Sequence, residues 1–185
     1  YIKFHNKVNP EFVILQMTSD KLNQDYIYER LPIIINDKIN NPLQFIQHFF
    51  HYDYSKLEKI VNTDKNYNIL YNEDPTFAKV ITASYLIIYS KNDEDSQIFI
   101  THPKYLENQN YITVTKSEKS PDKLTNYDIF NPLEKPKDVK NNITFINIKL
   151  KHKQLIILPY KWIYFLEKND VNDAKYERYY LYNTL

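Results

Sequence analysis

The sequence predicts a mainly β protein, a single domain over residues 1–185 built as a jelly roll with a short N-terminal helix. Short apolar runs bounded by turn residues recur along the chain, which is typical of β-sandwiches and barrels. One early segment combines a helix start signal with helical spacing of its apolar residues. The 185 residues, of which 43% are apolar, suffice for one substantial core.

The N-terminal part predicts two short strands and then the helix. Phe12–Met17 is a short apolar run, and Leu31–Asp37 is rich in β-branched residues and is followed by turn residues. Asn41 is placed to cap a helix that begins at Pro42, where the missing N–H of proline costs nothing. The apolar residues that follow with roughly helical spacing are Leu43, Phe45, Ile46, Phe49 and Phe50.

The middle of the chain predicts further strands. Asn66–Tyr71 and Phe77–Ser90 are strand-like, and a charged turn lets Ser96–His102 pair back on the preceding strand as a hairpin. Residues 103–141 are rich in Lys, Asn, Pro and Asp. They predict a long polar loop around one short strand, Tyr111–Thr115.

Four strands are expected to close the chain. Their sequences are ITFINIKL (143–150), LIILP (155–159), KWIYFLE (161–167) and YERYYLYN (176–183). Together with the strands above and a single early helix, they favour an all-β sandwich or barrel, with a jelly roll as the first choice.

The composition excludes several classes of function. Lys and Arg total 24 against 23 acidic residues, a net charge of +1, without the basic excess of a nucleic-acid-binding protein. No apolar run approaches the roughly 20 residues that span a bilayer. The start, which is not Met, lacks the apolar stretch of a signal peptide. The absence of Cys excludes disulfides and Cys-based zinc sites.

The chain contains no glycine. A Gly-rich phosphate loop is therefore excluded, and with it nucleotide binding by a P-loop or a Rossmann turn. Turns that need a positive φ are expected to use Asn or Asp, which tolerate the left-handed region better than other non-glycine residues. Ile, Asn, Lys and Tyr are abundant instead, the residue usage of an AT-rich genome.

Two segments carry a resemblance to a known family. The block Leu158–Tyr164 contains a Leu-Pro step and then a Tyr/Trp-rich segment, Pro159, Tyr160, Lys161 and Trp162. The earlier Tyr28–Phe50 joins a β-branched strand to a short helix. In this order, these motifs resemble the cupin/JmjC-like double-stranded β-helix proteins. The AT-rich residue usage and the amino-acid sequence of the motif resemble those of cupin-like proteins encoded by large DNA viruses.

That resemblance implies an iron site of two His and one carboxylate, but the ligand positions differ here. In the family's hydroxylases, the second His follows the Pro-aromatic step by about five residues, which corresponds to Tyr164 or Phe165. The first His and the Asp come from a middle strand. The only His between residues 77 and 102 is His102, and no carboxylate stands two residues beyond it. We therefore expect the metal ligands to be lost.

His51 and Asp53 have the H-x-D spacing of such a site. They follow the apolar face of the expected helix, and a helix places residues two apart on different faces. An exposed His and Asp at a helix end are favoured over iron ligands. A second pair, His48 and His51, has the spacing of a helical metal chelate, but exposed residues are expected there too.

The remaining histidines, His5, His102 and His152, lie far apart among polar neighbours and are expected at the surface. An iron(II)/2-oxoglutarate hydroxylase would use His51 and Asp53, with His102 or His152 as the third ligand. This enzyme is the alternative to a protein without catalytic activity.

The aromatic residues of the family motif allow a further alternative. Tyr160, Trp162 and Tyr164 could form a platform that stacks on sugars, as in a carbohydrate-binding cupin. Core packing with Lys161 directed to solvent is the favoured interpretation. In a strand, Trp162 and Tyr164 would share one face.

The function expected from this sequence is a non-enzymatic structural or interaction protein, because a fold without its site is a scaffold or binding module. The resemblance implies a minor capsid or virion component of a large DNA virus. Its partners would be other proteins, such as viral coat proteins, and neither nucleic acid, a membrane span nor a cofactor is expected. The chain would reside in the virion, or in the host cytoplasm during assembly.

Overall fold

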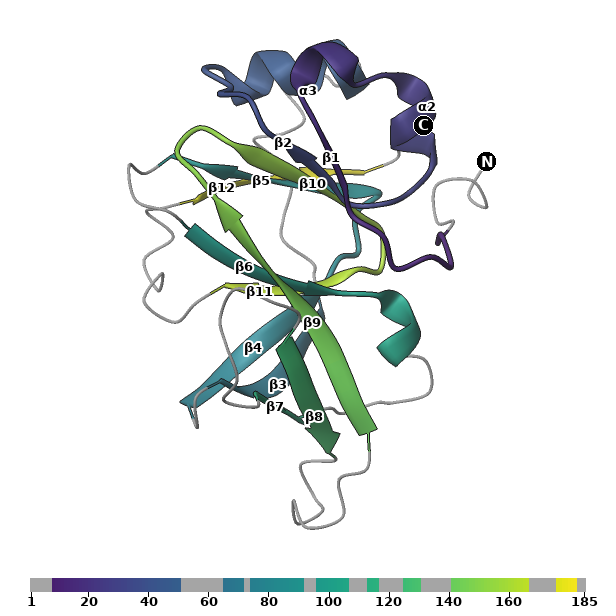
Figure 1. Ribbon diagram of the computed structural model, residues 1–185, viewed down its shortest axis with the longest axis vertical. Helices are drawn as coiled ribbons and strands as arrows, with labels where there is room; N and C mark the ends of the chain where they lie inside the picture. Colours follow the sequence, from purple (N-terminus) through teal and green to yellow (C-terminus); the bar gives the residue numbers. More distant parts are fainter. Residues whose placement is uncertain are drawn as a thin grey trace.

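The computed structural model describes residues 8–50, 65–71, 74–91, 96–106, 113–116, 125–130, 141–166 and 176–182. The candidate ligands His51 and Asp53, and also His5, lie outside them. Within these ranges the protein is mainly β, as the sequence predicts, with the helices α2 and α3 together at one end (Figure 1). No helix of the described part is long and apolar enough to cross a membrane.

The N-terminal elements are β1 (Leu15–Met17), the 3-10 helix η1 (Ser19–Lys21), α2 (Gln24–Tyr28), β2 (Ile33–Ile35) and α3 (Pro42–Phe50). The later strands are β3 (Lys65–Tyr71), β4 (Asp74–Val80), β5 (Tyr85–Ser90), β6 (Ser96–Thr101), β7 (Thr113–Lys116), β8 (Thr125–Phe130), β9 (Asn141–Leu150), β10 (Leu155–Pro159), β11 (Ile163–Leu166) and β12 (Tyr176–Leu181). A second 3-10 helix, η2 (Pro103–Leu106), follows β6.

Helix α3 confirms the predicted capping. The Asn41 side chain accepts a hydrogen bond from the Gln44 N–H at 3.1 Å, and Pro42 is the first helical residue. Phe45, Ile46 and Phe50 are buried. Helix α2, which the sequence did not predict, begins in the same way, because the Asn23 side chain accepts from the Tyr26 N–H.

Strands β1, β2, β10, β5 and β12, in that order, form a five-stranded sheet that we call sheet A. Strands β1 and β2 are parallel, and the other pairs are antiparallel. The remaining strands close into a barrel in the order β11-β4-β3-β7-β8-β9-β6. Sheet A lies between the helices and the barrel, so the molecule has layers (Figure 1).

The central strands of sheet A, β2, β10 and β5, are buried on both faces. On the helix side, Ile33, Ile87 and Ile157 pack in one cluster with Phe45 and Ile46 of α3. The opposite face packs against the barrel in a second cluster. That cluster includes Ile34, Leu86, Ile88, Ile156 and Leu158 from sheet A, with Ile98, Ile100, Ile148 and Tyr164 from the barrel. Double burial explains why β5 and β10 are continuous apolar runs rather than alternating ones.

The predicted hairpin between Phe77–Ser90 and Ser96–His102 is wrong. The first segment divides into β4, in the barrel, and β5, in sheet A. Strand β5 pairs with β10 and β12, whereas β6 pairs with β9 and β11. Strand β5 is buried along its whole length, and both of its partners come from the C-terminal part of the chain.

The predicted loop 103–141 is also partly wrong. It contains η2, β7 near the predicted Tyr111–Thr115, and the additional strand β8. Strand β8 joins β7 to β9 in the barrel. Its sequence, TNYDIF, lacks the apolar run on which the strand predictions depended. The four closing strands β9–β12 are confirmed.

Three described residues have a positive φ. The prediction that Asn or Asp would take such positions is wrong for all three. They are Arg30 (59°), Lys153 (63°) and Lys161 (68°). Lys153 and Lys161 are each the third residue of a four-residue turn, and these turns flank β10 on either side. Hydrogen bonds of the surrounding backbone hold both turns, so the fold outweighs the local preference of the side chain.

Candidate functional site

The segment Pro159–Trp162, which carries the resemblance to the cupin/JmjC-like proteins and is called the family motif below, forms the turn between β10 and β11. The Tyr160 N–H donates to the Ser84 carbonyl at 3.1 Å, and the Lys161 N–H donates to the Ile81 carbonyl at 2.9 Å. The Ile81 N–H in turn donates to the Trp162 carbonyl at 3.0 Å. The motif is therefore fastened to the segment that joins β4 to β5, and both connections cross between the barrel and sheet A at the same place.

Of the three aromatic residues considered for a sugar platform, Trp162 and Tyr164 are core residues, whereas Tyr160 is only partly buried. Trp162 is 0% exposed and Tyr164 is 1% exposed, and both belong to the cluster between sheet A and the barrel. Lys161 is exposed, as core packing of the aromatic residues predicts. A sugar could not stack on either buried ring without opening the fold. Within the described part of the chain, the Trp162 indole N–H has no hydrogen-bond partner.

His102 is buried, so its predicted surface position is wrong. Only 3% of the residue is exposed. Its Nε2 lies 2.7 Å from the Asn9 carbonyl, which can only accept, so Nε2 carries the proton. The other ring nitrogen, Nδ1, accepts from the Lys104 N–H at 3.0 Å. Both ring nitrogens are thus used in holding the chain together, which does not suit a metal ligand.

The His102 ring anchors the N-terminal segment over Trp162. Phe12 lies with its ring centroid 6.1 Å from that of His102 and 5.7 Å from that of Trp162. The His102 and Trp162 rings meet edge to face at 5.1 Å. The segment is further fastened by the Asn9 side chain, which donates to the Glu29 carbonyl at 2.7 Å. No pattern in the sequence pointed to this packing.

The positions that correspond to the family's second His are also packed. The Tyr164 hydroxyl lies 3.4 Å from the Tyr180 hydroxyl of β12. Phe165, 1% exposed, stacks on Phe99 at 4.6 Å and meets Phe145 at 5.2 Å. Phenol and phenyl groups packed in this way do not fit an iron(II) site.

The other candidate histidines do not come together in the described structure. His48 is exposed on α3, as predicted, and packs edge to face on Phe49. His152 lies in the turn between β9 and β10 and is partly buried. In the described ranges, no three His, Cys, Asp or Glu residues are grouped so that they could hold a metal ion.

Buried Tyr85 joins sheet A to the end of α2. Its hydroxyl donates to the Ile27 carbonyl at 2.8 Å, and the Arg30 guanidinium lies 4.6 Å from its ring centroid. Burial raises the pKa of the Tyr85 phenol well above its ordinary value of 10.0, and nearby Arg30 offsets only part of this effect. Burial also raises the pKa of Tyr179, with a further contribution from Glu177, whose carboxylate accepts the Tyr179 hydroxyl.

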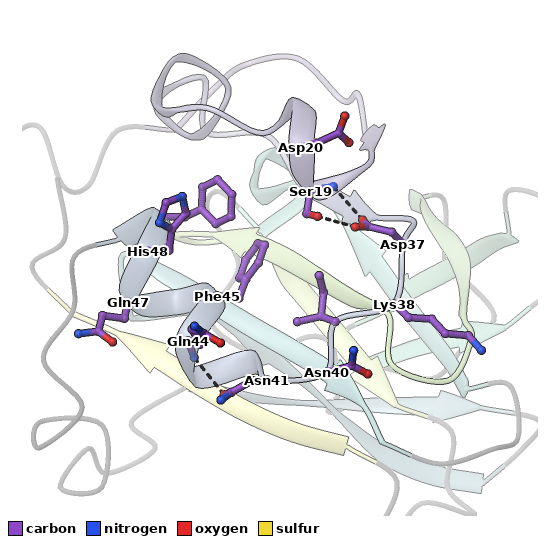
Figure 2. A pocket seen from close by; sticks show the side chains of 12 residues that line it. Ser19, Asp20, Asp37, Lys38, Asn40, Asn41, Gln44, Phe45, Gln47 and His48 are labelled. Carbon is purple, nitrogen blue, oxygen red and sulfur yellow. Dashed lines mark hydrogen bonds between the residues drawn. The ribbon is translucent and has the colours of Figure 1, made fainter.

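A cavity of about 740 Å³ opens on the helix side of the molecule, between η1, the loop after β2, and α3 (Figure 2). Asp37 turns toward Ser19, whose N–H donates to the Asp37 carboxylate at 2.8 Å and whose hydroxyl bonds to it as well. The residues that line the cavity are Ser19, Asp20, Asp37, Lys38, Ile39, Asn40, Asn41, Gln44, Phe45, Gln47, His48 and Phe49. The sequence did not single out this cavity, because its walls come from three separate segments.

Comparison with known proteins returns no matching protein-family model and no matching curated protein.

Proposed function

We propose that this chain is a non-enzymatic structural or interaction protein with a jelly-roll fold of the double-stranded β-helix type. The carrying observation is the filled interior between sheet A and the barrel. Tyr164 occupies it at a position where the resemblance to cupin/JmjC-like proteins would place the second His ligand, and Trp162 of the Pro-aromatic step fills the same cluster. A protein that has packed this space with apolar and phenolic groups retains the scaffold of the fold but not its catalytic centre.

The strand connections support the fold proposal. Strands β4, β5 and β6 lie in the barrel, in sheet A and in the barrel again. Strands β9 to β12 alternate between the two in the same way. Each crossing puts sequence neighbours on opposite sides of the core and pairs strands that are distant in sequence, such as β4 with β11 and β5 with β12. Such winding of antiparallel pairs between two facing layers is expected of a double-stranded β-helix.

We further propose that the partners are other proteins, namely coat proteins of a large DNA virus, so that the chain acts in the virion or, during assembly, in the host cytoplasm. Large side chains that could meet such partners are exposed in the N-terminal part, including Val13, Tyr26, Tyr28 and Leu43. Tyr is enriched in protein interfaces. Among the described strands, β12 is the last of sheet A, and a partner strand that added there would extend the sheet.

Metal analysis tests the non-enzymatic proposal. We expect the purified chain to contain no stoichiometric iron and to bind iron(II) no more tightly than its His51→Ala variant. His48→Ala is the matched control, because His48 is an exposed histidine of the same region. Stoichiometric iron that is lost in His51→Ala and kept in His48→Ala would overturn the proposal in favour of the hydroxylase.

Particle fractionation tests the partner proposal. The chain should co-sediment with virus particles and resist removal by washing, and Tyr28→Ser should weaken this association more than Gln16→Ser, a change at an exposed position of β1. A freely soluble monomer that is absent from particles would contradict a virion role.

A further inference from the structure

The cavity between η1, the loop after β2, and α3 has the chemistry of a site for an uncharged, hydroxyl-rich ligand. Its volume of about 740 Å³ lies within the range of roughly 300–1,000 Å³ that is usual for small-molecule sites. Four of its lining side chains are primary amides, Asn40, Asn41, Gln44 and Gln47. Each amide both donates and accepts hydrogen bonds, as a sugar hydroxyl does.

Several of these polar groups are already positioned by the protein. The Asn41 oxygen accepts from the Gln44 N–H, and the Asn40 oxygen accepts from the Lys153 ammonium at 3.1 Å. Because these bonds use only the amide oxygens, the side-chain NH₂ groups of Asn40 and Asn41 can still donate hydrogen bonds to a ligand. Ser19 holds the Asp37 carboxylate through two hydrogen bonds, and a carboxylate has further lone pairs to offer. Groups held in place before binding lose less conformational entropy when a ligand arrives.

The cavity also contains some aromatic surface, which comes from the partly buried Phe49 and the exposed His48, since Phe45 beneath them is buried. Phe45 and Phe49 pack at a centroid distance of 4.7 Å, and His48 meets Phe49 edge to face at the same distance. In Figure 2, the Phe45 ring lies between α3 and the loop that carries Asp37. Aromatic faces beside amides and carboxylates match a pyranose ring, which has an apolar C–H face and a polar rim of hydroxyls.

The charges favour a neutral ligand over a basic peptide. Asp20 and Asp37 are accompanied by Lys38 and by the imidazole of His48. The Asp20 carboxylate accepts the Thr18 hydroxyl, and that of Asp37 is held by Ser19. Neutral amides are as numerous in the lining as all of these titratable groups together. The two carboxylates exceed the one lysine by a single charge, so the cavity presents many hydrogen-bonding groups for little net charge.

We propose that this cavity binds an oligosaccharide through the amides of Asn40 and Gln44, the Asp37 carboxylate and the accessible ring surface of Phe49 and His48. The site lies on the helix side of sheet A, apart from the packed interior on which the proposed function rests. Its test is therefore independent of whether the chain belongs to a virus particle.

A glycan array, followed by calorimetric titration of the best-bound oligosaccharide, tests the proposal. Gln44→Ala and Asn40→Ala should each weaken binding by roughly fivefold, the loss of about one hydrogen bond. The matched controls are Gln16→Ala and Asn36→Ala, exposed residues of the same types outside the cavity. They should leave the affinity unchanged. Because Gln44 and Asn40 are exposed, all four variants should keep the fold, which circular dichroism checks.

Two results would overturn the proposal. One is an array on which no glycan is bound at millimolar concentration, or on which binding survives in both cavity variants. The other is a lysine-rich peptide that binds instead and is sensitive to Gln44→Ala and Asn40→Ala but not to the controls, which would assign the cavity to a basic protein segment.

Discussion

Lys161 occupies a backbone conformation that favours glycine, in a protein without glycine. The Trp162 N–H donates to the Pro159 carbonyl at 3.3 Å, and only the third residue of this turn has a positive φ, which is the geometry of a type II turn. The turn before β10 repeats the arrangement, since the Gln154 N–H donates to the Lys151 carbonyl at 3.0 Å and Lys153 is third. Each lysine holds a conformation that is unfavourable by about 1 kcal/mol.

Lys161→Gly should therefore stabilise the protein, by roughly 0.5–1 kcal/mol, because relief of the left-handed strain exceeds the added entropy of the unfolded chain. Lys151→Gly is the matched control. Lys151 is exposed in the neighbouring turn but has no positive φ, so the same change should destabilise by a similar amount. Urea denaturation measures both, and equal effects of the two substitutions would contradict the strain argument.

Tyr85 predicts a loss of stability in alkali. Its pKa is raised in the folded state, so below the ordinary value of 10.0 both states keep the proton and the stability is unchanged. As the pH rises above that value, the unfolded state loses its proton first, and the free energy of unfolding falls. Tyr85→Phe should reduce this fall, which begins near pH 10, as measured by urea denaturation at each pH between about pH 9 and pH 12.

The same substitution should cost only about 1 kcal/mol at neutral pH, because the Ile27 carbonyl also accepts from the Arg30 N–H at 3.3 Å and is not left unsatisfied. Tyr26→Phe, at a 38% exposed position, is the control. If the free energy of unfolding of Tyr85→Phe falls with rising pH as steeply as that of the wild type, burial does not raise the pKa of Tyr85.

At the scale of single elements, α3 depends on its cap. Asn41→Ala removes the acceptor of the Gln44 N–H and should cost about 1 kcal/mol of stability. Gln47→Ala, an exposed change within the same helix, should alter the stability by less than about 0.5 kcal/mol. Denaturation with urea measures the difference between the two. Equal stabilities would show that the cap contributes nothing.

Elements whose signals are local could be predicted from the sequence. Asn41 and Pro42 mark the start of α3, and the runs around Ile33–Ile35 and Leu155–Pro159 mark β2 and β10, because burial requires apolar residues there. Helix α2 was missed since it is only five residues long. Strand β8 was missed because its polar sequence lacks an apolar run, and the partners of β5 were missed because pairing with β10 and β12 is decided by the whole fold.

The candidate sites show the same division. Core packing of Trp162 could be predicted, because an aromatic strand in a domain of this size has to be buried. Burial of His102 could not, since it depends on Asn9 and Phe12, which are distant in sequence. The cavity could not be predicted from the sequence either. Asp37, Asn40 and Gln44 are ordinary turn and helix residues until the fold brings them beside η1.

At the scale of the whole molecule, Trp162 joins three parts of the structure: the N-terminal segment through Phe12, the barrel, and the cluster beneath sheet A. Trp162→Ala should cost about 3–5 kcal/mol, a large part of the roughly 5–15 kcal/mol that stabilises a typical domain. Thermal or urea denaturation measures this loss. If Trp162→Ala is as stable as the wild type but no longer binds a sugar, Trp162 is part of a sugar-binding platform and not a core residue.

The alternation of strands between sheet A and the barrel also constrains how the protein can be made. Tyr85 in β5 pairs with Pro159 in β10 and with Leu181 in β12, so the centre of sheet A stays open on the ribosome until the last of these strands has emerged. Pairings so distant in sequence form slowly. Meanwhile the apolar residues of β5 lack their cover, which exposes the nascent chain to aggregation and makes it a natural client for chaperones.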